Sequence, residues 1–360
     1  MKDKPKKSAL SEVSGINQPD SLSNAVVKRI QQKRKIIPSA KELIQAIKKG
    51  DKIALSRAIT LVESTNPEHL ERANKVINGC LPYANKSVRI GITGVPGVGK
   101  STFIEAFGTY LTSIGKKIAV LAVDPSSSIS HGSILGDKTR MEELVKDENA
   151  YIRPSASGAS LGGVARKTRE SIILCEACGF DTILIETVGV GQSETAVHSM
   201  VDFFLLLKIA GAGDELQGIK RGIMEMADTI VINKADGDNI SKAKLAKTEF
   251  NRALHLFPAK SSGWIPKVTT CSSYEKTGID TVWTIISEYF DLVKENHFFE
   301  MKRQDQSQFW MMETINEQLK SSFYNHPEII KLLEENKKAV STNKISPFAA
   351  AQLLLEKYFK

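Results

Sequence analysis

Six short apolar segments, each followed by a longer segment of helical character, occupy the middle of this chain of 360 residues. They read SVRIGIT, KIAVLAVD, DTILIET, DFFLLLKIA, DTIVINKAD and KVTTCSS, and they begin at residues 87, 117, 181, 202, 228 and 267. Near-continuous apolar strands that alternate with helices are typical of a parallel sheet covered on both faces. We therefore predict an α/β fold with a doubly wound, mostly parallel sheet over residues 86–297.

Helical patterns flank this predicted domain on both sides. Residues 40–85 contain three helix-like stretches and are predicted to form an N-terminal helical extension. Residues 298–360 contain three more, and the first of them carries apolar side chains at helical spacing: Phe309, Met312, Ile315 and Leu319. Such a stripe either packs back onto the domain or forms an oligomer contact, and the pattern leaves both open.

Charge is concentrated at the start of the chain. The net charge is +8, and residues 1–40 carry nine Lys or Arg against three Asp or Glu, which places +6 there. We interpret residues 1–39 as a basic, flexible leader rather than a nucleic-acid or membrane surface, because such surfaces form stripes on folded faces. No apolar run approaches the roughly 18 residues that a membrane span needs. We expect a cytoplasmic protein with no nucleic-acid or membrane partner.

Four cysteines, Cys80, Cys175, Cys178 and Cys271, are too few and too scattered for a disulfide framework. Cys175 and Cys178 form a CxxC near the end of a predicted helix, but no second Cys/His pair at zinc spacing accompanies them. We interpret them as small buried apolar residues.

A complete GxxxxGK[ST] phosphate-binding loop (P-loop) lies between the first predicted strand and a helix that begins near Lys100. Its glycines let the backbone amides surround a phosphate at the positive end of the helix. We expect Lys100 to reach the β- and γ-phosphates and the Ser101 hydroxyl to ligate Mg²⁺. The predicted phosphate-binding residues are Gly94, Val95, Pro96, Gly97, Val98, Gly99, Lys100, Ser101 and Thr102.

A second motif predicts which base is bound. Asn233, Lys234 and Asp236 form an NKxD sequence directly after a predicted strand, about 130 residues beyond the P-loop. A carboxylate at Asp236 can accept hydrogen bonds from the ring N–H and the exocyclic amine of guanine, a donor pair that adenine lacks. The next predicted strand ends near three further candidates for the base site: Ser272, Ser273 and Tyr274. GTP and GDP are therefore the expected ligands.

Acidic residues at strand ends complete the predicted site. Asp124 follows the second predicted strand, Glu186 follows the third, and Asp137 closes the loop after Asp124. Carboxylates beside a P-loop bind Mg²⁺ directly or through water, so these three and Ser101 are the predicted metal ligands. Glu186 opens an ExxG sequence whose Gly189 amide is placed to sense the γ-phosphate.

Hydrolysis also needs a positioned water and positive charge. Gln192 is a candidate for positioning the water, whereas Arg140 and Lys220 are basic residues that no pattern directs to the site. The predicted catalytic set is Lys100, Asp124, Glu186 and Gln192. We expect slow intrinsic turnover that a partner accelerates.

These motifs together resemble one family. The segments GITGVPGVGKST, AVDPSSS, GFDTILIETVGVGQSE, AGAGDELQGIKRGIME, NKAD and SPFAAAQLL are similar to those of the MeaB/ArgK/MMAA GTPases, which belong to the SIMIBI class of P-loop proteins. The similarity runs from about residue 40 to the C-terminus. It implies that residues 209–220 form an additional switch segment.

The resemblance further implies a function and an assembly. Members of this family are GTP-hydrolysing chaperones of adenosylcobalamin-dependent acyl-CoA mutases, usually methylmalonyl-CoA mutase, and they gate cofactor loading and protect the mutase. They form homodimers, which would make residues 298–360 a dimerisation segment. By position, Lys100, Ser101, Asp124, Asp137 and Glu186 match the phosphate and Mg²⁺ residues of the family.

Three other functions stay open at this point. One is a P-loop kinase of a small molecule, the function that the name ArgK reflects, which would transfer phosphate to an acceptor other than water. Another is a non-enzymatic binding module in which the nucleotide only stabilises a dimer, although metal carboxylates at two strand ends disfavour it. The last is a nickel-inserting GTPase of the same class. The six histidines are isolated in the sequence, which disfavours the nickel protein.

Overall fold

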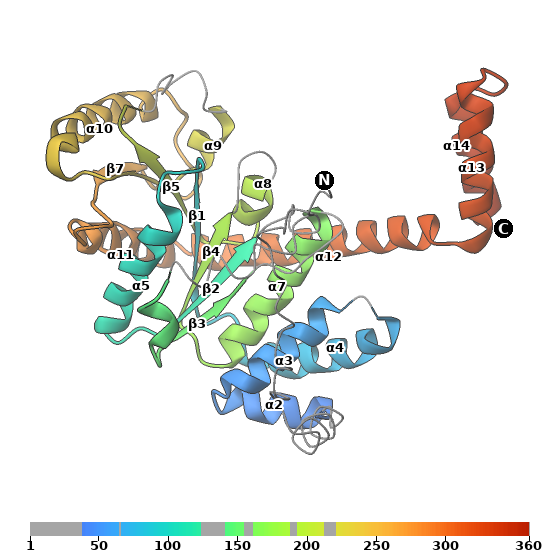
Figure 1. The fold of residues 1–360 in the computed structure, drawn as a ribbon, viewed down its shortest axis with the longest axis horizontal. Helices are drawn as coiled ribbons and strands as arrows, with labels where there is room; N and C mark the ends of the chain where they lie inside the picture. The colour runs from blue at the N-terminus through green and yellow to red at the C-terminus, as the bar shows by residue number, and fades with distance from the viewer. Residues whose placement is uncertain are drawn as a thin grey trace, which may run out of the picture.

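A single parallel sheet forms the centre of the molecule (Figure 1). The computed structural model describes residues 38–64, 66–123, 141–154, 161–187, 193–211 and 221–359. Seven strands within these residues pair in the order β3-β2-β4-β1-β5-β6-β7, and every pair is parallel. Their bounds are β1 Val88–Gly94, β2 Ile118–Val123, β3 Ala150–Arg153, β4 Thr182–Thr187, β5 Phe203–Ile209, β6 Thr229–Asn233 and β7 Lys267–Thr270. The predicted fold class is confirmed.

One strand, β3, is absent from the six that the sequence predicts. It contains four residues and pairs only with β2, so it lies at one edge of the sheet. Four residues give too short a pattern to distinguish a strand from a loop by periodicity.

Apolar side chains alternate between the two faces of the sheet, and helices cover both faces. In β4, Ile183 and Ile185 join one apolar cluster, while Leu184 between them joins the other. The first cluster is covered by α2 Ala40–Lys48, α3 Lys52–Glu63, α4 Pro67–Cys80, α7 Leu161–Ala177 and α8 Ser193–His198. The second is covered by α5 Lys100–Ser113 and α11 Ile279–Glu295.

At the β6–β7 end of the sheet, a third cluster packs α10 Ile240–Leu254 and α9 Arg221–Met226 against the strands. The described connections also contain three short 3₁₀ helices: η1 Leu81–Tyr83, η2 Leu144–Lys146 and η3 Gly237–Asn239.

Local signals in the sequence fix several helix starts. Ser39 caps α2 in a capping box with Glu42, and Asp51 accepts hydrogen bonds from two backbone amides at the start of α3. Each satisfies donors that the first helical turn leaves without a partner.

Three helices follow the sheet domain and form an arm, α12 Phe298–Tyr324, α13 Pro327–Ser341 and α14 Pro347–Tyr358. The arm extends away from the sheet, with α13 and α14 at its far end (Figure 1). The predicted apolar stripe on α12 is exposed in the single chain: Phe309 48%, Met312 52%, Ile315 43% and Leu319 55%. These side chains therefore do not pack back onto the domain. In the described part of the chain, no helix is long and apolar enough to cross a membrane.

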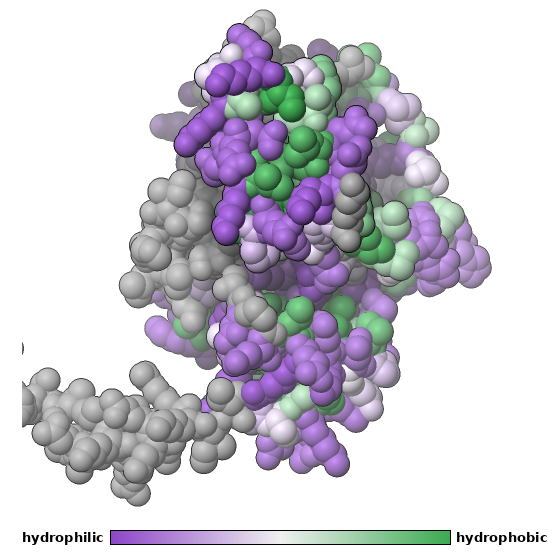
Figure 2. All heavy atoms as spheres, turned by 90° about the vertical axis from the view of Figure 1, so that its right-hand side faces the viewer, coloured by the Kyte–Doolittle hydropathy of each residue, from purple (hydrophilic) through white to green (hydrophobic). Residues whose placement is uncertain are grey.

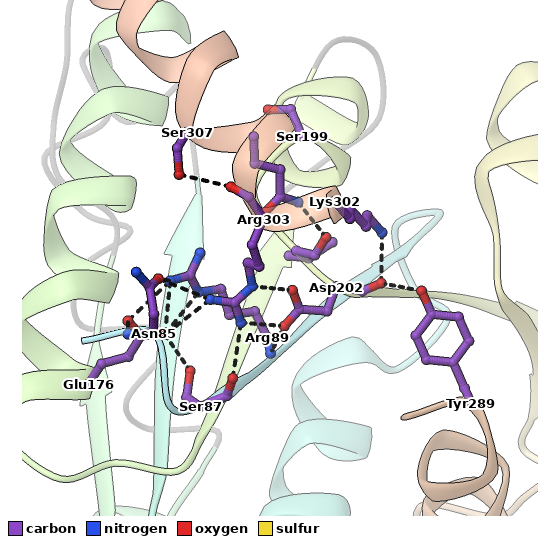
Figure 3. Close-up of polar contacts among 12 residues, drawn as sticks. Asn85, Ser87, Arg89, Glu176, Ser199, Asp202, Tyr289, Lys302, Arg303 and Ser307 are labelled. Atoms are coloured by element: carbon purple, nitrogen blue, oxygen red, sulfur yellow. Dashed lines mark hydrogen bonds and ion pairs between the residues drawn. The ribbon is translucent and has the colours of Figure 1, made fainter. Parts of the chain in front are cut away.

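A buried cluster of charged residues fixes the base of the arm to the sheet (Figure 3). Asp202 lies immediately before β5, and Arg303 of α12 donates to both of its carboxylate oxygens, at 2.5 and 2.6 Å. Arg89 of β1 donates to both carboxylate oxygens of Glu176 in α7, at 3.0 and 3.1 Å. All four residues are buried. The cluster thus joins a strand, the end of a helix and the arm through charge-assisted hydrogen bonds.

The cysteines of the CxxC sequence are buried and free, as predicted. Burial raises the pKa of the Cys178 thiol to about 11, so it stays protonated near neutral pH.

Candidate nucleotide-binding site

The P-loop connects the carboxyl end of β1 to the start of α5. β1 lies between β4 and β5 within the sheet, so the strand ends on both sides converge on this loop. The side chain of Val98 is fully buried and anchors the loop, whereas Pro96 and Gly97 are exposed. The exposed backbone is the part available to a phosphate.

Gly99 shows why this position requires glycine. Its φ is +92°, in the left-handed region, and an added Cβ would lie 2.9 Å from Nδ2 of Asn233. A larger residue would therefore be strained in its backbone and would also displace Asn233. The P-loop closes directly against the base-recognition motif.

Lys100 lies within this loop and is half-buried. Its Nζ donates to the carbonyl of Gly94 at 2.8 Å. Burial lowers the pKa of Lys100, while the nearby carboxylates of Glu186 and Glu194 oppose that shift. Lys100 thus donates to a backbone carbonyl that a phosphate oxygen can replace.

Among the three predicted metal-binding carboxylates, Glu186 is the one that lies within the described residues. It is buried at the end of β4, and its backbone pairs in register with Ile92 of β1. The next residue, Thr187, donates a hydrogen bond to the hydroxyl of Thr93, directly before the P-loop, at 2.9 Å. The end of β4 is thereby connected to the residue that precedes Gly94.

Asn233 connects the base motif to the P-loop. It ends β6 and is buried, and its Nδ2 donates to the carbonyl of Val98 at 2.9 Å. Its Oδ1 accepts from the backbone amide and the hydroxyl of Ser273, at 3.1 and 2.7 Å. One side chain therefore positions the phosphate loop and the loop after β7.

Lys234 and Asp236 complete the base motif. Lys234 has a φ of +58°, and its Nζ donates to the carbonyl of Gly97 at 3.0 Å. The hydroxyl of Ser272 donates to Oδ2 of Asp236 and leaves the other carboxylate oxygen for a ligand. Tyr274 is 87% exposed.

The predicted site residues that the structure describes lie together at the carboxyl edge of the sheet. These are the P-loop residues, Glu186, Asn233, Lys234, Asp236, Ser272, Ser273 and Tyr274. Asp124, Asp137, Gly189 and Gln192 lie outside the described residues, as do Arg140, Lys220 and residues 212–219.

The sequence analysis did not single out Glu194. It lies in the first turn of α8, is buried, and acts electrostatically on Lys100. The only signal in the sequence is its position two residues after Gln192, which does not indicate burial.

The sheet order, the P-loop and the base motif define the chain as a P-loop nucleotide-binding protein of the GTPase type. The family model described as "Methylmalonyl Co-A mutase-associated GTPase MeaB" matches residues 55–328. The chain belongs to this family, and it is a GTPase.

Relatives and one solved structure agree with this assignment. The chain is 44% identical to GTPase ArgK of Escherichia coli over 315 residues, which cover 88% of this chain and 95% of that protein. It is 46% identical over 326 residues to the mouse protein named methylmalonic aciduria type A homolog, mitochondrial, covering 88% of this chain and 79% of the other. A crystal structure titled LAO/AO transport system kinase matches with a TM-score of 0.72 and 38% identity, and covers 91% of this chain and all of the other.

Proposed function

We propose that this GTPase binds GTP with Mg²⁺ and acts as a chaperone of methylmalonyl-CoA mutase or a related acyl-CoA mutase. In this role it assists the loading of adenosylcobalamin and protects the mutase. The observation that carries the nucleotide part is the hydrogen bond from Asn233 to Val98, which joins the base motif to the P-loop. The family match to a mutase-associated GTPase supports the partner.

The donor set fits Mg²⁺. Ser101 and Glu186 offer only oxygen atoms, and so do Asp124 and Asp137, which match the family by position. Oxygen ligands are those that Mg²⁺ prefers in proteins. Once bound, the ion would neutralise charge on the phosphate oxygens.

The chain's own groups contribute binding and orientation. Lys100 exchanges its bond to the Gly94 carbonyl for the phosphates, and the P-loop amides bind the remaining phosphate oxygens. Asp236, oriented by Ser272, accepts from guanine. Asn233 fixes the P-loop relative to the loop after β7 through its hydrogen bonds to Val98 and Ser273. Binding of guanine at the base site would therefore also position the phosphates in the P-loop.

The test is GTP hydrolysis by the purified full-length protein with and without methylmalonyl-CoA mutase from the same organism. We expect slow hydrolysis alone and at least about tenfold faster hydrolysis with the mutase, since partner-supplied groups can accelerate GTPases much further. Cofactor loading is followed in the same mixture by the absorbance of adenosylcobalamin bound to the mutase.

Two results would contradict the proposal. Hydrolysis that the mutase leaves unchanged would remove the mutase as client. Phosphate that appears on a small acceptor rather than in solution would favour a kinase. Bovine serum albumin at the same concentration controls for non-specific stabilisation.

We also propose that residues 298–360 form a homodimer contact. Besides the exposed stripe on α12, apolar residues of α13 and α14 are exposed, among them Ile330, Phe348 and Leu353. In Figure 2, which views the molecule from the end of the arm, apolar side chains gather between hydrophilic ones. Apolar patches of this kind are typical of protein–protein contacts.

Light scattering tests the dimer. We expect the mass of two chains for the parent protein and of one chain for the double variant Ile315→Glu/Leu319→Glu, because both charges would enter the apolar contact. Asn316→Glu/Gln318→Glu adds the same two charges at neighbouring exposed positions and should leave the dimer intact. A double variant that remains dimeric would exclude this face of α12.

A further inference from the structure

Three side chains of α12 donate hydrogen bonds to backbone carbonyls of one short segment, residues 199–202. Lys302 donates to Asp202 at 2.7 Å, Gln306 to Val201 at 2.8 Å and Trp310 to Ser199 at 3.0 Å. Lys302, Ser199 and Asp202 are labelled in Figure 3. The three donors are four residues apart in turn, so they lie on one face of the helix. α12 is therefore attached to this segment along two of its helical turns.

The segment bound by α12 joins α8 to β5, and it packs tightly on the P-loop strand. A Cβ added to Gly91 of β1 would lie 3.0 Å from Val197 and 3.1 Å from Val201. The absence of a side chain at Gly91 is what permits this close approach. The strand that leads into the P-loop is thus in direct contact with the segment that α12 binds.

The other end of α8 faces the nucleotide site. Glu194 lies in its first turn, is buried, and its carboxylate raises the pKa of Lys100 against the effect of burial. Phosphates that attract Lys100 would change the electrostatic environment of Glu194. Residues 194–202 therefore interact electrostatically with Lys100 at one end and accept hydrogen bonds from the arm at the other.

The junction also retains unsatisfied polar atoms. Oε1 of Gln306 and one terminal guanidinium nitrogen of Arg169 in α7 are buried without a hydrogen-bond partner among the described residues. The guanidinium of Arg169 lies 5.7 Å from the ring centre of Trp310. Buried polar atoms without partners are rare in folded proteins, because a missing hydrogen bond there costs free energy. Gln306 of α12 and Arg169 of α7 thus each bring one such atom to this junction.

We propose that residues 194–202 couple nucleotide binding to the orientation of the arm through Lys302, Gln306 and Trp310. This coupling rests on the proposed nucleotide site. Because coupling between two sites is reciprocal, a partner that displaces the arm changes the affinity for the nucleotide by the same factor. The three donors are positioning residues, since they contact neither the nucleotide nor the metal.

Hydrogen–deuterium exchange of the full-length protein, with and without a non-hydrolysable GTP analogue and Mg²⁺, tests the coupling. We expect the analogue to protect residues 94–101 and to change exchange in residues 299–311 on the order of 5-fold or more, the lower end of typical coupling. In the variant Gln306→Met/Trp310→Phe, protection of residues 94–101 should persist while the response of residues 299–311 is lost. Phenylalanine keeps an aromatic ring beside Arg169 but has a smaller side chain and lacks the indole N–H donor.

The matched control is Gln308→Met, which makes the same change at an exposed position of the same helix. It should respond to the analogue like the parent protein. A merely structural role for Gln306 and Trp310 predicts faster exchange in α12 with and without nucleotide alike, and that result would overturn the proposal.

The remaining outcomes separate this proposal from the one on which it rests. Protection of residues 94–101 in the parent with unchanged exchange in residues 299–311 would overturn the coupling alone. A parent protein in which the analogue protects neither region would overturn both proposals. A variant that retains the full response of α12 would exclude these side chains as the connection.

Discussion

Replacing Asp236 by asparagine is expected to lower the affinity for GTP at least about 100-fold and to raise the affinity for xanthosine triphosphate. In the proposed site the carboxylate would accept two hydrogen bonds from guanine, and hydrogen bonds to charged groups contribute about 1.5–3 kcal/mol each. An asparagine amide would present a donor where guanine has its amino group, but xanthine has a carbonyl oxygen there. The measurement is titration of both nucleotides by calorimetry.

Asp238→Asn is the matched control, because Asp238 is exposed in η3, two residues away. It should bind GTP like the parent protein. GTP affinity that is unchanged in Asp236→Asn would remove Asp236 from the base site, and the orientation of its carboxylate by Ser272 would need another explanation.

Arg303→Ala is expected to have the largest effect on stability, a loss of about 3–5 kcal/mol in the free energy of unfolding. Both carboxylate oxygens of Asp202 accept from Arg303, and Asp202 is only 1% exposed. Removing the guanidinium leaves a buried carboxylate with its main cation gone. The measurement is denaturant unfolding of the full-length chain, followed by the change in midpoint.

Two further variants test whether the loss of stability comes from the buried carboxylate of Asp202. Lys337→Ala breaks an exposed ion pair with Glu334 in the same arm and should cost less than about 1 kcal/mol. Arg303→Lys keeps the charge but cannot reproduce the paired hydrogen bonds, so it should lie between the two. Equal midpoints for Arg303→Ala and Lys337→Ala would show that Asp202 gains other partners when Arg303 is removed.

The sheet was predictable because its strands are buried on both faces and therefore continuously apolar. The predicted segment KIAVLAVD contains the whole of β2, which runs from Ile118 to Val123. The edge strand β3 has no such pattern. The helices of the arm were predictable from their periodicity, but periodicity identifies an apolar face and not what covers it. The exposure of Ile315 and Leu319 required the structure.

The motifs of the candidate site were predictable, but their contacts were not. The P-loop and the base motif each have a fixed local spacing, whereas the hydrogen bond from Asn233 to Val98 joins residues 135 positions apart. The buried charges are a stronger case. Arg89 lies in an apolar strand and Arg303 in an amphipathic helix, and nothing local indicates that both pack near Glu176. Only the topology of the sheet brings them together.

The length of α12 turns a small movement at its base into a large one at its tip. The helix contains 27 residues, and its hydrogen bonds to residues 199–202 all lie in its first half. At 1.5 Å per residue it is about 40 Å long, so a tilt of ~5° about its base displaces the far end by about 3–4 Å. In the proposed coupling the helix would act as a lever that pivots at the buried charges and moves α13 and α14. Sub-ångström adjustments around a phosphate, too small to alter the domain surface, would become displacements that a bound protein can detect.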